Sequence, residues 1–421
     1  MVVLVIFRLG CAIPVPFIQP SAISAMIAAD SGSMLNYLNM ISGGAFANAT
    51  LFALGVTPYI NSSIIITLLT VAIPYLENLS KEGEEGRKKI AKITRYVSVV
   101  IAFILSFGYY VVLKRNGALT YTEGMAGTFA AMVIIATFIA GSMLIMWMGE
   151  QIDKKGIGNG ISLIIFAGII SRLVPSATTL IAMVQAGIAG EIKYLVMAVL
   201  IPIFAVLVVA FAVVLNNAER RIPIQYAKRV VGRKMMGGQS THLPIKVNMS
   251  GVMPVIFASS IMSIPGTIKS FFNIEGEFAK KFLSIFDYNG AVYVVGYVLL
   301  IIAFNYFYVS MQYNPIEIAN NLRKNNGVIP GFRPGKNTQE FIAKVISKLT
   351  FIGAMFLVVV AVLPIITGNL TNTGIQLGGT SILIVVGVAL EVAQQLEAQM
   401  ISRHHKGCQS IIPDWKFPYA P

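Results

Sequence analysis

The feature that most constrains this chain is a series of long apolar runs, separated by charged or Gly- and Pro-rich connections. A helix needs about 20 mostly apolar residues to cross the hydrocarbon of a bilayer. Ten segments approach or meet this requirement: 1–18, 51–75, 94–113, 127–149, 158–174, 192–216, 250–272, 291–312, 345–367 and 379–399. These runs are too continuous for the alternating strands of a membrane barrel. The sequence therefore predicts an all-α polytopic membrane protein with ten transmembrane helices.

The basic residues predict how these spans are oriented. Of the 32 Lys and Arg residues, 24 fall in one alternating set of connections: 77–95, 150–158, 217–248, 313–348 and 401–421. Basic residues concentrate on the cytoplasmic side of membrane proteins, where they also meet anionic lipids. We therefore expect both termini and the large basic loops in the cytoplasm. This distribution also explains the net charge of +14 better than nucleic-acid binding does, although loop contacts with ribosomal RNA stay open.

Ionisable residues are almost absent from the predicted spans. Apart from Arg8 near the start, no Lys, Arg, Asp, Glu or His lies in the middle of one. Proton relays usually need such residues, which argues against a proton-coupled transporter. A secondary transporter of small solutes that binds sodium through backbone carbonyls stays open. The three histidines lie outside the spans and form no HExxH motif, so neither a catalytic nor a metal site is predicted, and no cofactor.

The second span is interrupted near its start. Gly43 and Gly44 open a short apolar stretch, and Gly55 and Pro58 separate it from the longer run that follows. Gly and Pro break helical hydrogen bonding, and irregular backbone at membrane depth must line a cavity or be buried in protein. We therefore expect a half-helix over about 44–54, inside a channel or transporter. A single proline-kinked helix is the alternative.

Several motifs, in order along nearly the whole chain, resemble those of the SecY family. This family comprises the pore-forming subunits of the bacterial Sec protein translocase and is related to the large subunit of the eukaryotic translocon. The matching residues are 43–44 with 53–60, 81–89, 156–162, 226–229, 239–248, 330–338 and 378–381. The family usually has a basic segment before the first span, whereas here Met1 already lies in that span. The tail after Gly407 also departs from the family and receives no role.

The resemblance implies two five-helix halves that form a clamshell around an hourglass pore. The N-terminal half would cover 1–174, a hinge loop 175–191 and the C-terminal half 192–400. Cytoplasmic docking loops would lie at 217–248 and 313–344, before a cytoplasmic tail at 401–421. The implied function is a protein-conducting channel of the bacterial cytoplasmic membrane, without enzymatic activity. It would pass unfolded secretory polypeptides and release signal sequences and transmembrane segments sideways into lipid.

The resemblance also implies which residues do this. A ring of apolar side chains would close the waist of the pore: Val56, Ile60, Ile165, Ile169, Ile256 and Ile384. The half-helix would plug the outer funnel with Gly44, Ala45, Phe46, Leu51, Phe52 and Leu54. The lateral gate would include Asn61, Ser259 and Ser260. In the family, isoleucine often stands where this chain has Val56.

The implied partners bind in the membrane and on the cytoplasmic loops. A SecA motor ATPase or a translating ribosome would supply energy and dock on Arg220, Arg221, Lys228, Arg229, Arg233, Lys234, Arg333 and Lys336. Small membrane subunits resembling SecE and SecG, anionic lipids and substrates with signal sequences complete the expected set. Simple solvated linkers are the alternative interpretation of the two loops.

Overall fold

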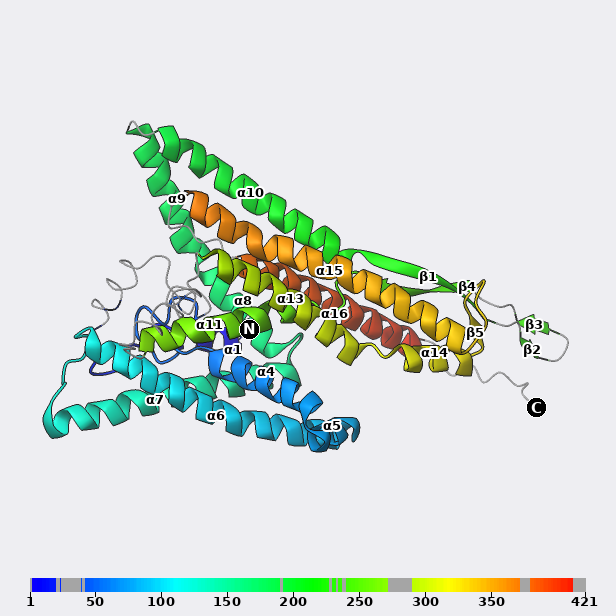
Figure 1. The fold of residues 1–421 in the computed structure, drawn as a ribbon, viewed down its shortest axis with the longest axis horizontal. Helices are drawn as coiled ribbons and strands as arrows, with labels where there is room; N and C mark the ends of the chain where they lie inside the picture. The colour runs from blue at the N-terminus through cyan, green and yellow to red at the C-terminus, as the bar shows by residue number, and fades with distance from the viewer. Residues whose placement is uncertain are drawn as a thin grey trace.

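The computed structural model describes residues 2–19, 42–189, 192–226, 240–271, 290–371 and 379–411, with short pieces at 23, 39, 229–231 and 234–236. Most of the described residues are helical, and the longest helices run along the long axis of the molecule (Figure 1). A small β-structure and the short helix α14 gather at one end, and the hairpin of α9 and α10 projects from the other.

The first part of the chain forms helices that begin with α1 and end with α9. The elements are α1 (Val2–Gly10), α4 (Thr57–Ala72), α5 (Pro74–Lys81), α6 (Glu84–Arg115), α7 (Gly124–Lys155), α8 (Gly160–Ser171) and α9 (Leu173–Ile188). The helices α4 and α5 meet at an angle of 100°. Pro74 begins α5, where a missing backbone N–H costs nothing.

The second part contains both helices and strands. The elements are α10 (Ile192–Asn217), β1 (Glu219–Tyr226), β2 (Arg229–Val231), β3 (Lys234–Met236), β4 (Ser240–Lys246), α11 (Met253–Phe271), α13 (Ala291–Gln312), α14 (Pro315–Lys324), β5 (Gly327–Val328), α15 (Lys336–Thr371) and α16 (Gly379–Ile411). The membrane-embedded helices α10, α11, α13, α15 and α16 share one buried apolar cluster, which includes Val208, Val255, Ile301, Leu357 and Leu383.

The observed helices fit a multi-pass membrane protein. Within the described residues, seven helices are long and apolar enough to cross a bilayer, or eight if the bent pair of α4 and α5 is one span. A shorter apolar helix covers Met253–Ile268. Each of the ten predicted spans has a helix at its position, but α1 has only 9 residues. The total of ten spans therefore stays a prediction.

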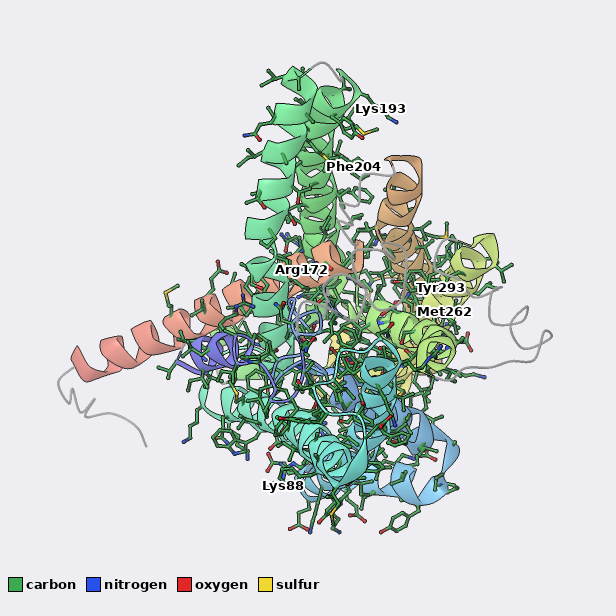
Figure 2. All side chains as sticks on the ribbon, turned by 90° about the vertical axis from the view of Figure 1, so that its left-hand side faces the viewer. Lys88, Arg172, Lys193, Phe204, Met262 and Tyr293 are labelled. Atoms are coloured by element: carbon green, nitrogen blue, oxygen red, sulfur yellow. The ribbon has the colours of Figure 1, made fainter. Side chains whose placement is uncertain are left out.

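The predicted hinge loop at 175–191 is wrong for most of its length. The chain is helical to Ile188, and only Arg172 separates α9 from α8. A proline often marks a helix boundary, but Pro175 does not interrupt this helix. Here it lies in the first turn of α9, where proline is tolerated. Figure 2 shows Arg172 near the base of the resulting α9–α10 hairpin and Lys193 near its tip.

The two predicted cytoplasmic loops also contain regular structure, so the fold is mostly rather than entirely helical. The strands β1 and β4 pair antiparallel, from Glu219 opposite Lys246 to Gln225 opposite Ser240. The strand β5 of the second loop joins the other edge of β1, in the order β4-β1-β5. On β1, the buried Ile222 and Ile224 alternate with the exposed Arg221 and Pro223. This alternation is typical of a strand in a sheet with one buried face. The two loops therefore form one platform at the end of the helices (Figure 1).

Candidate functional site

The six side chains of the predicted ring come together from separate parts of the chain. Val56 precedes α4, which carries Ile60, and the remaining members lie on α8, α11 and α16. All six belong to one apolar cluster. Val56, Ile165 and Ile384 are its buried members, and Ile60, Ile169 and Ile256 pack against them. The cluster therefore joins helices of the first and second parts of the chain through short, branched aliphatic groups.

The segment before α4, residues 42–56, is a chain of successive turns. The predicted half-helix at 44–54 is therefore wrong. Gly43, Gly44 and Gly55 have positive φ angles of 67°, 90° and 55°, and Ala49 has a φ of 43°. These left-handed conformations interrupt an α-helix, so the segment instead closes short-range bonds such as Ala49 N–H to the carbonyl of Phe46 at 3.2 Å. We call residues 42–56 the turn segment.

The turn segment fills the space between two apolar clusters. Ala45 and Phe52 are buried in the cluster that contains the ring residues, with Leu51 packed against it. Phe46 and Leu54 are buried in a second cluster, with side chains of α6 and α7. Gly44 has no side chain, and a Cβ added there would meet nothing within 4 Å. The predicted plug residues thus lie directly beside the predicted ring.

One tyrosine that the sequence analysis missed holds the turn segment. Tyr109 of α6 is completely buried, and its hydroxyl donates to the backbone carbonyl of Phe46 at 2.7 Å. The two rings also stack, with centroids 4.4 Å apart. A buried hydroxyl needs such a partner, because leaving it without a hydrogen bond costs free energy. The signal in the sequence is weak, because a tyrosine within an apolar run is common.

The predicted lateral gate has a cavity of about 250 Å³ beside the turn segment. Asn61 of α4 lines it, opposite Ile104 and Leu105 of α6. Its far wall is formed by α11, through Ser263, Ile264, Thr267 and Ile268. Ser259 and Ser260 are not among the lining residues, and the hydroxyl of Ser259 donates to the carbonyl of Ile256 at 2.9 Å. The polar residues of α11 at this cavity therefore lie one turn or more beyond the predicted pair.

The predicted docking residues are spread over the platform and its loops. Arg220 and Arg221 are exposed on β1, and Arg221 pairs with Glu219 at 2.6 Å. Arg333 and Lys336 are exposed on the second loop. The backbone of Arg229 lies in β2 and that of Lys234 in β3. Lys228 and Arg233 lie outside the described residues.

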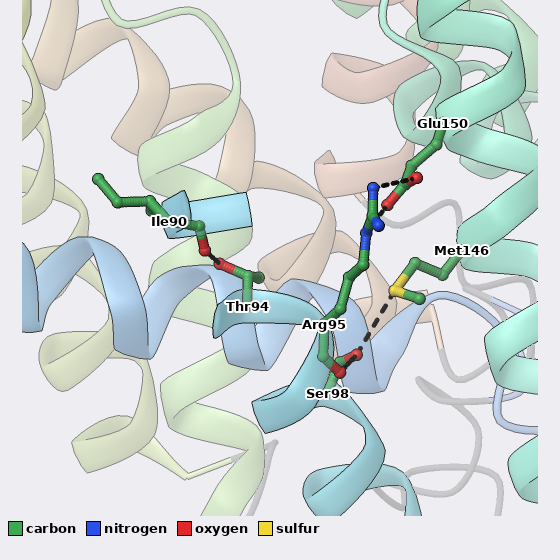
Figure 3. Close-up of polar contacts among 6 residues, drawn as sticks. All are labelled: Ile90, Thr94, Arg95, Ser98, Met146 and Glu150. Atoms are coloured by element: carbon green, nitrogen blue, oxygen red, sulfur yellow. Dashed lines mark hydrogen bonds and ion pairs between the residues drawn. The ribbon is translucent and has the colours of Figure 1, made fainter. Parts of the chain in front are cut away.

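An ion pair joins the N-terminal half of α6 to the C-terminal end of α7. Arg95 donates through two nitrogens to the two carboxylate oxygens of Glu150, each at 2.6 Å, as Figure 3 shows. The hydroxyl of Ser98 lies 3.5 Å from the sulfur of Met146 in the same interface. Bidentate arginine pairs fix orientation as well as distance. This contact therefore sets how the two helices lie beside each other.

The motif at 156–162 forms the joint between the early helices and α16. The Asn159 side chain caps α8 by accepting from the backbone N–H groups of Ile161 and Ser162. The N–H of Gly158, which has a φ of 79°, donates to the side-chain oxygen of Gln395 at 2.6 Å. This bond links residues 237 positions apart. Asn159 and Gly158 of this motif are thus explained by a cap and by a long-range contact.

Comparison with known proteins places these features in one family. The family model SecY matches residues 50–393. "Protein translocase subunit SecY" of Halalkalibacterium halodurans is 42% identical over 414 residues, covering 97% of this chain and 94% of its own. The Escherichia coli protein of the same name is 40% identical over 408 residues, covering 96% and 90%.

Solved channels share the fold. One, described as "The structure of a protein conducting channel", superposes with a TM-score of 0.66 at 19% identity, covering 96% of this chain and 92% of its own. Sec61 in the canine ribosome-channel complex from the endoplasmic reticulum gives a TM-score of 0.63 at 19% identity, with the same coverage. At this identity the likeness concerns the fold, and the function rests on the curated relatives.

Proposed function

This chain belongs to the SecY family, and on that premise we propose how its residues form a protein-conducting channel. The channel passes unfolded secretory polypeptides across the membrane. The observation that carries the proposal is the meeting of six aliphatic side chains from four separate regions of the chain, directly beside the turn segment. In the proposed channel, ten membrane spans form two halves around an hourglass-shaped passage, and the six side chains meet at its narrowest point.

The aliphatic cluster acts as the constriction of the channel. Val and Ile have stiff first torsions, so the groups hold a defined opening. A hydrophobic constriction excludes water and ions when it is empty, because water leaves a narrow apolar passage. It also offers no strong polar grip, so every type of side chain can move through it. The same residues therefore serve both sealing and transport.

The turn segment acts as the plug that closes the constriction in the resting channel. Its buried residues Ala45, Phe46, Phe52 and Leu54 fill the space beside the ring. Burial of two phenylalanine side chains stabilises this position by about 1.5–3 kcal/mol each. A moving polypeptide displaces the segment by replacing these contacts with its own.

The cavity between α4, α6 and α11 acts as the start of the lateral exit. Its lining is mainly apolar, and its polar residues are Thr57, Asn61, Ser263 and Thr267. A signal sequence is an apolar helix, so it can replace the aliphatic contacts there. Hydrogen bonds between membrane helices contribute only about 0.6 kcal/mol on average, which suits a seam that opens and closes. Asn61 therefore keeps its proposed gate role, and Ser263 and Thr267 join it.

The platform of β1, β4 and β5 acts as the docking surface for the energy source. Exposed Arg220, Arg221, Arg333 and Lys336 suit acidic surfaces of a SecA-type motor ATPase or the phosphates of a ribosome. The channel lies in the bacterial cytoplasmic membrane with both termini and this platform in the cytoplasm. SecE-like and SecG-like subunits and anionic lipids cover its apolar flanks. No catalytic step is required of the chain itself.

Crosslinking tests the proposal directly. A photoreactive residue at Ile165, which is 4% exposed in the empty channel, should capture a secretory polypeptide stalled during export. The same probe at Leu200 of α10, which is 59% exposed on the outside of the bundle, should capture lipid and no substrate. Capture at both positions, or at Leu200 alone, would contradict a passage lined by Ile165. Uptake of a small solute would instead favour a transporter.

A further inference from the structure

The turn segment touches three helices at points where only glycine fits. A Cβ built on Gly10 of α1 would lie under 3.0 Å from the ring of Phe52. One on Gly141 of α7 would lie under 3.0 Å from the backbone oxygen of Leu51. At a third point the contact is backbone to backbone: a Cβ on Gly43 of the segment would lie 2.9 Å from the Cα of Gly168 on α8. Real Cβ contacts do not occur at such distances.

We infer that Gly10 of α1, Gly141 of α7 and Gly43 of the segment, which faces the backbone of α8, form a glycine seat that sets how firmly the channel is closed. The inference rests on the proposed plug role of the turn segment and adds the residues that regulate it. These glycines are positioning residues, since they act on the pore through the segment. The segment can approach α1 and α7 closely because Gly10 and Gly141 carry no side chain, and it can approach α8 because its own Gly43 carries none.

The turn segment cannot simply retreat from a side chain added to the seat. The N–H of Leu51 donates to the carbonyl of Ile13 at 3.0 Å, and the N–H of Val15 donates to that of Ala49 at 3.0 Å. These bonds hold the segment from the side of residues 13–15, while the carbonyl of Leu51 faces Gly141. A methyl group at position 141 must therefore push the segment away from these partners.

The contact at Gly10 differs in kind, because it involves a side chain. The Phe52 ring is 2% exposed and lies 5.8 Å from the Phe7 ring, measured between centroids, in a stacked arrangement. A methyl group at position 10 would collide with this buried ring. Replacing the ring by a smaller side chain should remove this collision. No such remedy exists at Gly141, where the clash is with backbone.

The position of the glycine seat also explains how the turn segment can hold the pore closed independently of the opening of the lateral exit. The seat lies on α1, α7 and α8, whereas the lateral cavity is bounded by α4, α6 and α11. The segment can therefore stay attached to the seat, and through Tyr109 to α6, while α11 on the far wall of the cavity separates. Weakening the seat should lower the barrier to opening without removing the exit.

The experiment measures ion conductance of the full-length chain, reconstituted with its membrane partners and without substrate. Overpacking a close contact commonly shifts an equilibrium by a factor of about ten or more. Gly141→Ala and Gly10→Ala should therefore raise the idle conductance and allow export of a protein with a defective signal sequence. Gly296→Ala of α13 is the matched control, because its Cβ would meet only Met262, at an ordinary 3.5 Å.

A second substitution separates the seat from general damage. Phe52→Leu should return Gly10→Ala close to the conductance of the Phe52→Leu channel alone. Leu51→Ala should not rescue Gly141→Ala, since the backbone oxygen remains. Idle conductance of Gly141→Ala equal to that of Gly296→Ala would overturn the inference, as would failure of Phe52→Leu to rescue Gly10→Ala. Substrate capture at Ile165 would still stand in that case, so the proposed function fails only if that crosslink fails.

Discussion

At the residue scale, the side chains that matter are ordinary aliphatic and aromatic groups whose role depends on what surrounds them. Ile164 and Ile165 are neighbours on α8 and are both buried, yet only Ile165 belongs to the predicted ring. Tyr109 is one of many aromatic residues in the spans, but it alone donates its hydroxyl to the carbonyl of Phe46. Substitutions at this scale should therefore change the polarity of one group while keeping its size.

Polar substitution of the ring should make the channel leak. Ile60→Asn and Ile169→Asn place amide groups in the apolar cluster, and these groups hydrogen-bond water that the aliphatic lining excludes. We expect higher ion conductance in reconstituted bilayers and weaker discrimination between signal sequences. Ile169→Leu is the control, since it keeps an apolar side chain of the same volume. Unchanged conductance in both asparagine variants would remove these residues from the ring.

Loss of one hydroxyl should loosen the turn segment. Tyr109→Phe keeps the stacked ring but removes one of the two donors to the Phe46 carbonyl, which retains the Ala49 N–H. The lost hydrogen bond is worth about 0.5–1.5 kcal/mol. We expect more frequent brief openings of the idle channel in single-channel recordings. Tyr96→Phe on the same helix is the control, because Tyr96 is 65% exposed. Equal opening frequencies in the two variants would show that the hydroxyl does not retain the segment.

At the scale of elements, the proposed docking platform depends on strands from two loops, since Gln225 pairs with Ser240 of its own loop and with Val328 of the second loop. Pairing places the exposed arginines of β1 at the same end of the molecule as β5 of the second loop (Figure 1). The backbone of Arg333 is also held, because its carbonyl accepts from the Thr338 hydroxyl at 2.9 Å. A partner therefore meets an ordered surface.

Charge reversal at Arg333 should stop export without unfolding the chain. The side chain is exposed, so Arg333→Glu removes no buried contact. We expect motor-driven export of a secretory protein to stall in membrane vesicles, with the thermal unfolding midpoint unchanged. Lys348→Glu applies the same charge change to an exposed residue of α15 outside the predicted loops, and it should export normally. Normal export by Arg333→Glu would end its docking role.

At the scale of the whole molecule, the arrangement of the early and late helices depends on few polar contacts. The bond from the Gly158 N–H to Gln395 is one, and it lies at the start of α8. The neighbouring Gln394 instead accepts from Lys246 at 3.0 Å, so two adjacent residues of α16 hold different parts of the chain. The helices α8 and α16 also carry three of the predicted ring residues, so the Gly158–Gln395 bond helps to set the position of the proposed constriction.

Removing the joint should make the channel easier to open. Gln395→Leu leaves the Gly158 N–H unpaired, and the lost bond is worth about 0.5–1.5 kcal/mol. We expect a small fall in the thermal unfolding midpoint and faster initiation of export. Gln394→Leu removes an exposed bond to β4 and should leave initiation unchanged. A Gln395→Leu channel that initiates export at the normal rate would show that this contact does not control opening.

The sequence by itself determined the membrane class, the positions of the helices and the family, because apolar length and local motifs are properties of neighbouring residues. The family resemblance also gave six candidate ring residues, and the structure places them in one apolar cluster. The shape of the turn segment, the helical course of 175–188, the sheet shared by two loops and the contacts of Tyr109 and Gln395 were decided only by the tertiary structure. These features depend on which distant groups meet, since a left-handed glycine, a hydroxyl or an amide finds its partner only once the helices have packed.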